Sequence, residues 1–224
     1  MTVLHYMVIW IGTFVILVSF VLSLLLNKKF RIRNYMKGFY ILPLIALLLS
    51  VNTIFNILFH AYNNKHFFLL QYSLSILDLI FWRVFFVNLF TNIKDVNKVK
   101  LFFLIVLILT SILFFLNDWG NPNFQAISIF NFCKTLFCIL YFYKLFKDIP
   151  EKNITLEPSF WIVTGLFFYS GLSIPFYSLH NYIKSNTPLF ISTNIFAISN
   201  MLIIIMHLFF IKAYLCTTRL HRAS

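Results

Sequence analysis

Three ionisable side chains stand inside long apolar stretches of this sequence: Asp78, Lys134 and Arg83. A charge near the centre of a bilayer costs roughly 2.5 to 3.5 kcal/mol on insertion scales, so each of them needs a partner or a function. Asp78 and Lys134 both lie about ten residues, or about 15 Å, below the expected outer ends of their helices. Because an opposite charge offsets much of the cost of burial, we expect these two side chains to pair.

Arg83 is the competing partner for Asp78. It follows Asp78 by five residues, which turns it about 140° around a helix, so it faces another direction. Its long side chain could instead reach the membrane interface by snorkelling. Both pairings remain open at this point.

Polar side chains repeat at helical spacing in four of the apolar stretches, which gives each of them a polar face. The four faces hold Asn52, Asn56 and His60; Gln71, Ser75, Asp78 and Trp82; Asn131, Lys134 and Cys138; and Thr193, Asn200 and His207. Lipid cannot satisfy these groups, so we expect them to point inward and either bond to one another or line a hydrated pocket. For the Asn and Ser residues packing is the simpler interpretation, whereas the charged pair favours a functional site.

His207 and one glycine-containing stretch are further candidates. His207 lies deep enough to be a pH sensor, with a packing role as the alternative. Gly165 and Gly171 allow close approach of helices, and Pro175 removes a backbone donor and commonly kinks a membrane helix. The stretch from 160 to 180 is therefore a candidate moving helix, with a static kink as the alternative.

Motifs for known membrane chemistry are absent from the sequence. The last apolar stretch has no mid-membrane lysine for retinal, since Lys212 stands at its end, and Asp78 is the only intramembrane carboxylate. Cys133, Cys138 and Cys216 have neither disulfide nor zinc spacing. No nucleophile elbow, Walker or dinucleotide-binding pattern occurs. The sequence therefore predicts no catalytic residue, no cofactor and no metal.

The elements that must position these residues follow from composition. The chain is 61% hydrophobic and 11% charged, against about 25% charged in soluble domains. Its apolar residues form blocks long enough to cross a bilayer, so we predict an all-α membrane protein, a single seven-transmembrane-helix bundle over residues 1–224. The predicted spans are 4–26, 39–60, 68–91, 101–116, 126–146, 160–180 and 190–214.

The direction of the spans follows from the distribution of Lys and Arg, because positive loops stay in the cytoplasm. Fourteen of the 18 basic residues fall in alternate connections and in the tail region, whereas the other connections hold only Lys65 and Lys184. This predicts an N-terminus outside and a cytoplasmic C-terminus, in the cytoplasmic membrane of a bacterium. The net charge of +12 is thereby explained by topology, and nucleic acid is not expected as a partner.

One run, residues 157–171 (EPSFWIVTGLFFYSG), has a distinctive pattern. It resembles a stretch found in small seven-helix membrane proteins of Bacteroidetes-type bacteria and in the seven-helix input modules of sensor histidine kinases. The segment from Thr193 to Asn200 looks similar as well. The resemblance implies a sensory or accessory role, with a kinase supplying the signalling output.

The leading hypothesis is therefore a sensory or receptor-like membrane module without its own output domain. It would signal through a partner such as a sensor kinase, and its cytoplasmic connections, Lys28 to Lys37 and Lys144 to Lys152, are candidate docking surfaces. Alternatives are a small transporter, an ion or proton channel, and a membrane accessory protein, including an anti-phage accessory. An intramembrane lipid enzyme is less favoured, because no catalytic constellation was found. The sequence does not indicate an oligomeric state.

Overall fold

The computed structural model is all-helical in the part of the chain that it describes. The backbone is described for residues 3–29, 39, 41–59, 65–90, 93–116, 124–148, 154–179, 182–183, 186 and 189–223. Side chains are described for residues 7–25, 39, 41–51, 73–90, 96–113, 124–147, 154–179, 182–183, 186 and 197–218. Within these ranges the structure has seven long α-helices and one short 3₁₀ helix, so the predicted all-α fold is confirmed.

The helices match the predicted spans closely. Their bounds are α1 Val3–Lys29, α2 Ile41–Phe59, α3 Lys65–Leu89, α4 Ile93–Leu116, α5 Phe124–Asp148, η2 Ile154–Leu156, α6 Pro158–Ser178 and α8 Leu189–Ala223. The largest differences are at the start of α4 and the end of α8, which extend beyond the apolar blocks predicted at 101–116 and 190–214. A helix can continue out of the hydrocarbon into the polar interface, so hydropathy marks the lipid-embedded part rather than the helix ends.

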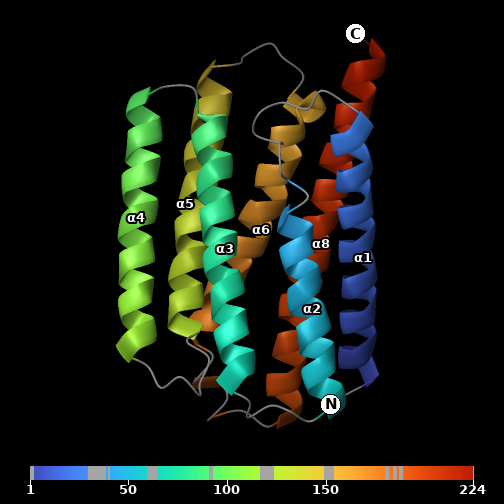
Figure 1. Ribbon diagram of the computed structural model, residues 1–224, viewed down its shortest axis with the longest axis vertical. Coiled ribbons are helices and arrows are strands. Elements are labelled where there is room, and N and C mark those ends of the chain that lie inside the picture. The colour runs from blue at the N-terminus through green and yellow to red at the C-terminus, as the bar shows by residue number, and fades with distance from the viewer. Residues whose placement is uncertain are drawn as a thin grey trace.

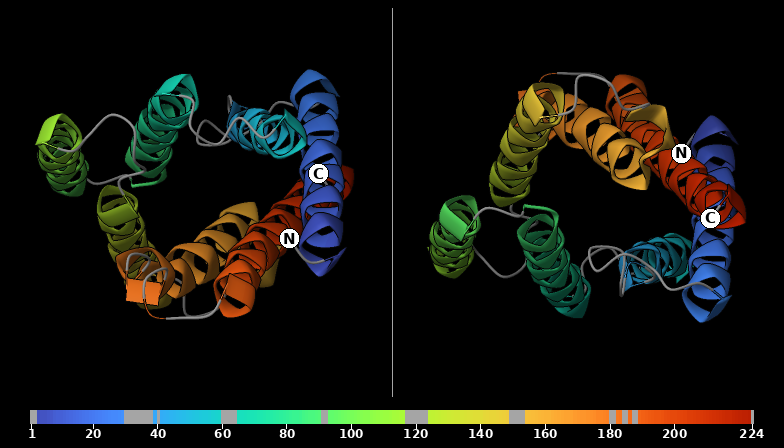
Figure 2. Two further views of the ribbon diagram at one scale, coloured as in Figure 1. Left: turned by 90° about the horizontal axis from the view of Figure 1, so that it is seen from below. Right: turned by 90° about the horizontal axis from the view of Figure 1, so that it is seen from above.

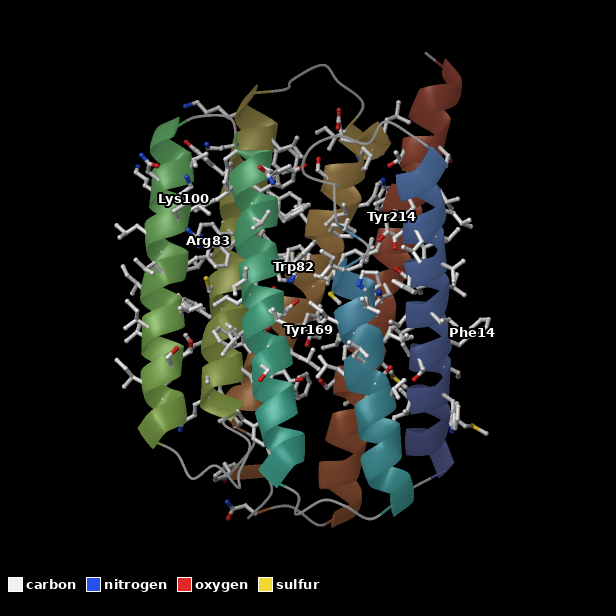
Figure 3. All side chains as sticks on the ribbon, in the orientation of Figure 1. Phe14, Trp82, Arg83, Lys100, Tyr169 and Tyr214 are labelled. Carbon is white, nitrogen blue, oxygen red and sulfur yellow. The ribbon has the colours of Figure 1, made fainter. Side chains whose placement is uncertain are left out.

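The outer surface of the bundle is apolar, as expected for a protein solvated by lipid. Five helices in the described ranges are long and apolar enough to cross a membrane: Met7–Leu25, Val96–Leu113, Phe124–Lys147, Pro158–Ser178 and Ala197–Thr218. Large side chains such as Trp10 and Phe14 remain exposed on α1, and Figure 3 shows Phe14 pointing away from the bundle. Soluble monomers rarely expose contiguous apolar surface of this extent, so the chain is a multi-pass membrane protein.

The helices run alternately up and down, and the two ends of the chain lie at opposite ends of the bundle (Figure 1). These ends are called here the Val3 end and the Ala223 end. Figure 2 shows α1, α2, α3 and α4 on one side and α5, α6 and α8 on the other. The most extensive contacts are those of α6 with α8, of α5 with α6 and of α1 with α8. Helix α4 lies outside the ring formed by the other helices (Figure 2) and contacts α3 and α5.

An aromatic cluster fills the interior of the bundle on the Ala223 side of Asp78. Phe39, which precedes α2, is 2% exposed and packs edge-on against Trp82, Phe210 and Tyr214, with ring centroids 5.3–6.3 Å apart. Figure 1 shows α2 starting well inside the bundle rather than level with its neighbours, which is why Phe39 reaches the core. We call Phe39, Trp82, Phe85, Phe210 and Tyr214 the aromatic plug.

Candidate functional site

Asp78 and Lys134 form an ion pair between α3 and α5. The Lys134 ammonium donates to Asp78 Oδ2, with Nζ and Oδ2 2.5 Å apart. The Lys134 side chain is 7% exposed and that of Asp78 is 25% exposed. The pairing predicted from matched depth is therefore present in the structure. Each charge loses water on burial, and the partner offsets part of that loss.

Arg83, the alternative partner, points away from Asp78. It is exposed on α3, and Figure 3 shows it extending from α3 toward α4 rather than into the bundle. This orientation follows from its five-residue separation from Asp78, which places the two side chains on different faces of one helix. Arg83 therefore lies outside the site, although it was a candidate partner for Asp78 in the sequence analysis.

Trp82 holds the second carboxylate oxygen of Asp78. Its indole Nε1 donates to Asp78 Oδ1 over 2.9 Å, across one turn of α3. The Trp82 ring is 1% exposed and belongs to the aromatic plug. Both oxygens of Asp78 are thus bonded, one to Lys134 and one to Trp82, which fixes the orientation of the carboxylate. The sequence placed Trp82 on the polar face of α3 but did not assign it this role.

A cavity of about 210 Å³ opens beside the ion pair. Its wall contains both members of the pair and also Trp82 and Tyr169, and Figure 3 shows Trp82 and Tyr169 pointing into the centre of the bundle. Other lining residues come from α1 and α2 (Val8, Ile9, Gly12, Thr13, Ile16, Leu42, Ile45, Ala46, Leu49, Ser50), from α3 and α5 (Ser75, Ile127, Phe130, Asn131) and from α6 and α8 (Leu166, Asn200, Ile203, Met206). Every long helix except α4 contributes to this wall.

Three of the predicted polar residues line the cavity together with the ion pair: Ser75, Asn131 and Asn200. The side chains of Asn52, Asn56 and Gln71 lie outside the described residues, so their positions are not assigned. Sequence reasoning did not identify Tyr169, Thr13 and Ser50 as part of the cavity wall. Tyr169 lies between Gly165 and Gly171 in the distinctive run, and that placement is the one signal that could have indicated it.

His207 is buried away from this cavity wall. It is fully buried, and its ring meets that of Phe210 edge-on with centroids 5.3 Å apart. Among the described residues neither ring nitrogen has a hydrogen-bond partner. His207 is not among the residues that line the cavity, so the polar face predicted for α8 divides between Asn200 in the wall and His207 behind it.

Hydrogen bonds join α5 to α6 along most of their length. Asn131 Nδ2 donates to Ser173 Oγ over 2.9 Å, and Thr135 Oγ1 donates to Ser170 Oγ over 2.9 Å. Further pairs are Ser128 with Ser178 at 2.6 Å and Tyr141 with Ser159 at 2.9 Å. Asn131 is thus in both the cavity wall and this interface, so α6 is coupled to the helix that carries Lys134.

The three residues of the proposed moving helix differ in their surroundings. A Cβ at Gly165 would lie 2.7 Å from Phe209 Cβ and 3.1 Å from the Met206 carbonyl oxygen, so α6 and α8 approach closely there. A Cβ at Gly171 would meet only Thr135, at 3.8 Å, which is ordinary contact. Pro175 is exposed and lies in the last turn of α6, so a bend there would redirect only the end of the helix.

The distinctive run 157–171 joins α6 to η2 and to α8 near the Ala223 end. Trp161 Nε1 donates to the Thr155 carbonyl oxygen over 2.8 Å, and the Trp161 ring stacks on Phe209 at 5.9 Å between centroids. Lys212 Nζ lies 5.6 Å from the centre of the same ring. This Trp161 joint therefore connects the start of α6 with the part of α8 beyond the cavity.

The wall of the cavity combines one ion pair with hydroxyl and amide groups and many apolar side chains. In the described ranges no three His, Cys, Asp or Glu side chains come together as a metal site would require. The ion pair offers a fixed dipole and the ammonium hydrogens of Lys134, and most of the surrounding wall is apolar. Comparison of the chain with protein-family models, with curated proteins and with solved structures finds no match in any of the three.

Proposed function

We propose that this chain is a receptor-like sensory module with seven membrane spans, its N-terminus outside and its C-terminus in the cytoplasm of a bacterium. A ligand enters the cavity, changes the contacts of Asp78 and Lys134, and alters the helix ends that face a signalling partner. The resemblance of the run 157–171 to the input modules of sensor histidine kinases supports this role.

Two observations support the proposed topology. The helices alternate in direction in Figure 1. The basic residues concentrate in the connections that follow the first, third and fifth spans and in the C-terminal tail, and the alternation assigns these to the Ala223 end of the bundle. Positive loops are retained in the cytoplasm, so this side is assigned to the cytoplasm. Reporter fusions at the two termini test the assignment. Reporters active in the same compartment would reject both the odd number of spans and the direction.

The observation that carries the proposed function is the position of the ion pair in the wall of a cavity built by six helices. A ligand in this cavity contacts α1, α2, α3, α5, α6 and α8 at once. Any difference in its affinity for two helix arrangements therefore shifts the equilibrium between them. Small shifts of packed helices are a common form of switching.

The aromatic plug favours a receptor over a continuous pathway. Phe39, Trp82, Phe85, Phe210 and Tyr214 are each at most 2% exposed, and they occupy the interior between the ion pair and the Ala223 end. A ligand that reaches the pair therefore meets packed rings on that side. Trp82 belongs to both the plug and the pair, which gives the ligand site a direct contact with the cytoplasmic half.

Hydrogen–deuterium exchange of the full chain in nanodiscs tests this coupling without any ligand. Replacing Asp78 by Asn removes the ion pair, and we expect faster exchange near η2 and at the Trp161 joint, far from the substitution along the chain. Arg83→Gln is the matched control, because it removes a charge from the same helix outside the site, and we expect no change there. Changes confined to the neighbourhood of residue 78 would argue against signalling.

A transporter or proton channel is the second candidate, since an ion pair at mid-membrane is also typical of ion pathways. Proteoliposomes containing a pH-sensitive dye distinguish the two functions. The receptor proposal predicts no proton flux above that of empty liposomes under an applied potential. Flux that is abolished by Asp78→Asn and retained by Arg83→Gln would replace the receptor with a transporter.

A further inference from the structure

The size of the cavity limits its occupant to a small molecule. Its volume is about 210 Å³. An engineered apolar cavity of about 150 Å³ binds benzene, whereas drug-sized pockets begin near about 300 Å³. A single ring with a short substituent therefore matches the available space.

Most of the cavity wall is apolar. The apolar side chains come from all six contributing helices, for example Ile9 on α1, Ile45 on α2, Phe130 on α5 and Met206 on α8. Such a wall rewards the burial of apolar surface and offers few partners to a strongly hydrated molecule. The greater part of the ligand is therefore apolar.

Several polar groups in the wall already have hydrogen-bond partners within the protein. Thr13 donates to the Ile9 carbonyl oxygen and Ser50 to that of Leu47, so both hydroxyl hydrogens are used within their own helices. Asn131 donates to Ser173. Asp78 already accepts from both Trp82 and Lys134. Among these groups, the ammonium of Lys134 has three hydrogens and, within the described residues, one bonded partner.

Charge balance restricts the ligand further. The Asp78 and Lys134 charges cancel, so the site is neutral before a ligand arrives. An anion or a cation would add an uncompensated charge next to a largely apolar wall, which is more costly than adding a hydrogen-bonded neutral group. The ligand is therefore uncharged and presents a hydrogen-bond acceptor.

Building on the proposed receptor function, we infer that the cavity binds an uncharged, ring-sized, mostly apolar molecule whose acceptor oxygen takes a hydrogen bond from Lys134. Molecules of this class partition into membranes, so the bilayer concentrates them around the protein.

Four probes of nearly equal shape test this inference: acetophenone, ethylbenzene, benzoate and benzylammonium. Thermal unfolding of the detergent-purified full chain is measured against probe concentration, because a ligand that binds the folded state raises the unfolding midpoint. We expect acetophenone to bind at least about tenfold more tightly than ethylbenzene, since it alone adds an acceptor for a charged donor without adding charge. Lys134→Met removes that preference.

The probes also partition into the detergent micelle, and a pair of variants on α2 distinguishes this effect from binding in the cavity. Ala46 lines the cavity and Leu48 is 48% exposed on the outer face. Ala46→Phe fills the cavity and abolishes the acetophenone shift, whereas Leu48→Phe retains it. Ala46→Leu replaces Ala46→Phe if the larger side chain prevents folding.

Three results would overturn the inference. These are tighter binding of benzoate or benzylammonium than of acetophenone, equal binding of acetophenone and ethylbenzene, and probe shifts that do not differ between the Ala46→Phe and Leu48→Phe proteins. The exchange experiment on Asp78→Asn uses no probe. The receptor function can therefore stand when the ligand class is wrong, and the two failures are distinguishable.

Discussion

Trp82 and Asp78 are bonded across one turn of α3, with the indole Nε1 2.9 Å from Asp78 Oδ1. The other oxygen of the carboxylate receives the Lys134 ammonium. One acidic side chain thus links α5, through the ion pair, to the aromatic plug, through the indole. The orientation of Asp78 depends on both contacts.

Replacing Trp82 by Phe keeps an aromatic ring in the plug and removes the indole donor. A hydrogen bond to a charged group contributes about 1.5 to 3 kcal/mol, so we expect a loss of this order in the free energy of unfolding. Trp161→Phe is the matched control, because its indole donates to a neutral carbonyl oxygen, that of Thr155. Its loss should be about 0.5 to 1.5 kcal/mol. Equal losses in denaturation by SDS would show that the charge of Asp78 adds nothing to the Trp82 bond.

A double-mutant cycle tests the ion pair. Asp78→Asn and Lys134→Met each leave an uncompensated group, and breaking a buried pair costs about 3 to 5 kcal/mol, with the lower figure expected because Asp78 is 25% exposed. The double variant removes both charges and should recover part of that loss. Arg83→Gln should stay within about 0.5 kcal/mol of the parent protein, since Arg83 is exposed. Strictly additive losses for Asp78 and Lys134 would reject the coupling.

The glycines of α6 provide a second matched pair. Gly165→Ala places a Cβ 2.7 Å from Phe209 Cβ, and overpacking of this kind costs about 1 to 3 kcal/mol. Gly171→Ala meets Thr135 at 3.8 Å and should be neutral or slightly stabilising, because alanine favours the helix. Melting temperatures in one detergent compare the two. A Gly165→Ala protein as stable as Gly171→Ala would mean that α6 and α8 are not tightly packed at this point.

The bond between Asn131 and Ser173 should be worth much less than the ion pair. Interhelical hydrogen bonds in membranes contribute about 0.6 kcal/mol on average, so Ser173→Ala should cost about this amount. Ser111→Ala is a suitable reference, because its hydroxyl donates to the Leu107 carbonyl oxygen within its own helix. If Ser173→Ala lowered the free energy of unfolding as much as Asp78→Asn does, the hydrogen bonds between α5 and α6 would stabilise the bundle as strongly as the ion pair does.

The helices and the ion pair were predictable from the sequence for a common physical reason. Lipid forces apolar residues into blocks of defined length, and a buried charge is so costly that its depth indicates its partner. Matching Asp78 with Lys134 by depth therefore placed two helices side by side. Depth alone left Arg83 as a competing partner for Asp78, and the choice between Lys134 and Arg83 required the structure.

Other parts of the site were not predictable in this way. Serine is tolerated on any face of an apolar helix. The spacing of Ser170 and Ser173 in the sequence therefore does not indicate their hydrogen bonds to α5. Beyond Lys100, helix α4 is almost entirely apolar, and nothing in its sequence indicates that it lies outside the ring. The inward path of Phe39 depends on α2 starting inside the bundle, which is a property of packing and not of hydropathy.

The extensive contact between α1 and α8 has a consequence for biogenesis. During synthesis α1 enters the membrane before α8 has been made. Until then the face of α1 that is buried in the native structure, which includes Ser19 and Ser23, lacks its native neighbour. The wall of the cavity is complete only when α8 is in place, because Asn200, Ile203 and Met206 belong to it. A nascent chain halted before that step can form the ion pair of α3 and α5, yet it has neither the complete cavity wall nor the native neighbour of α1.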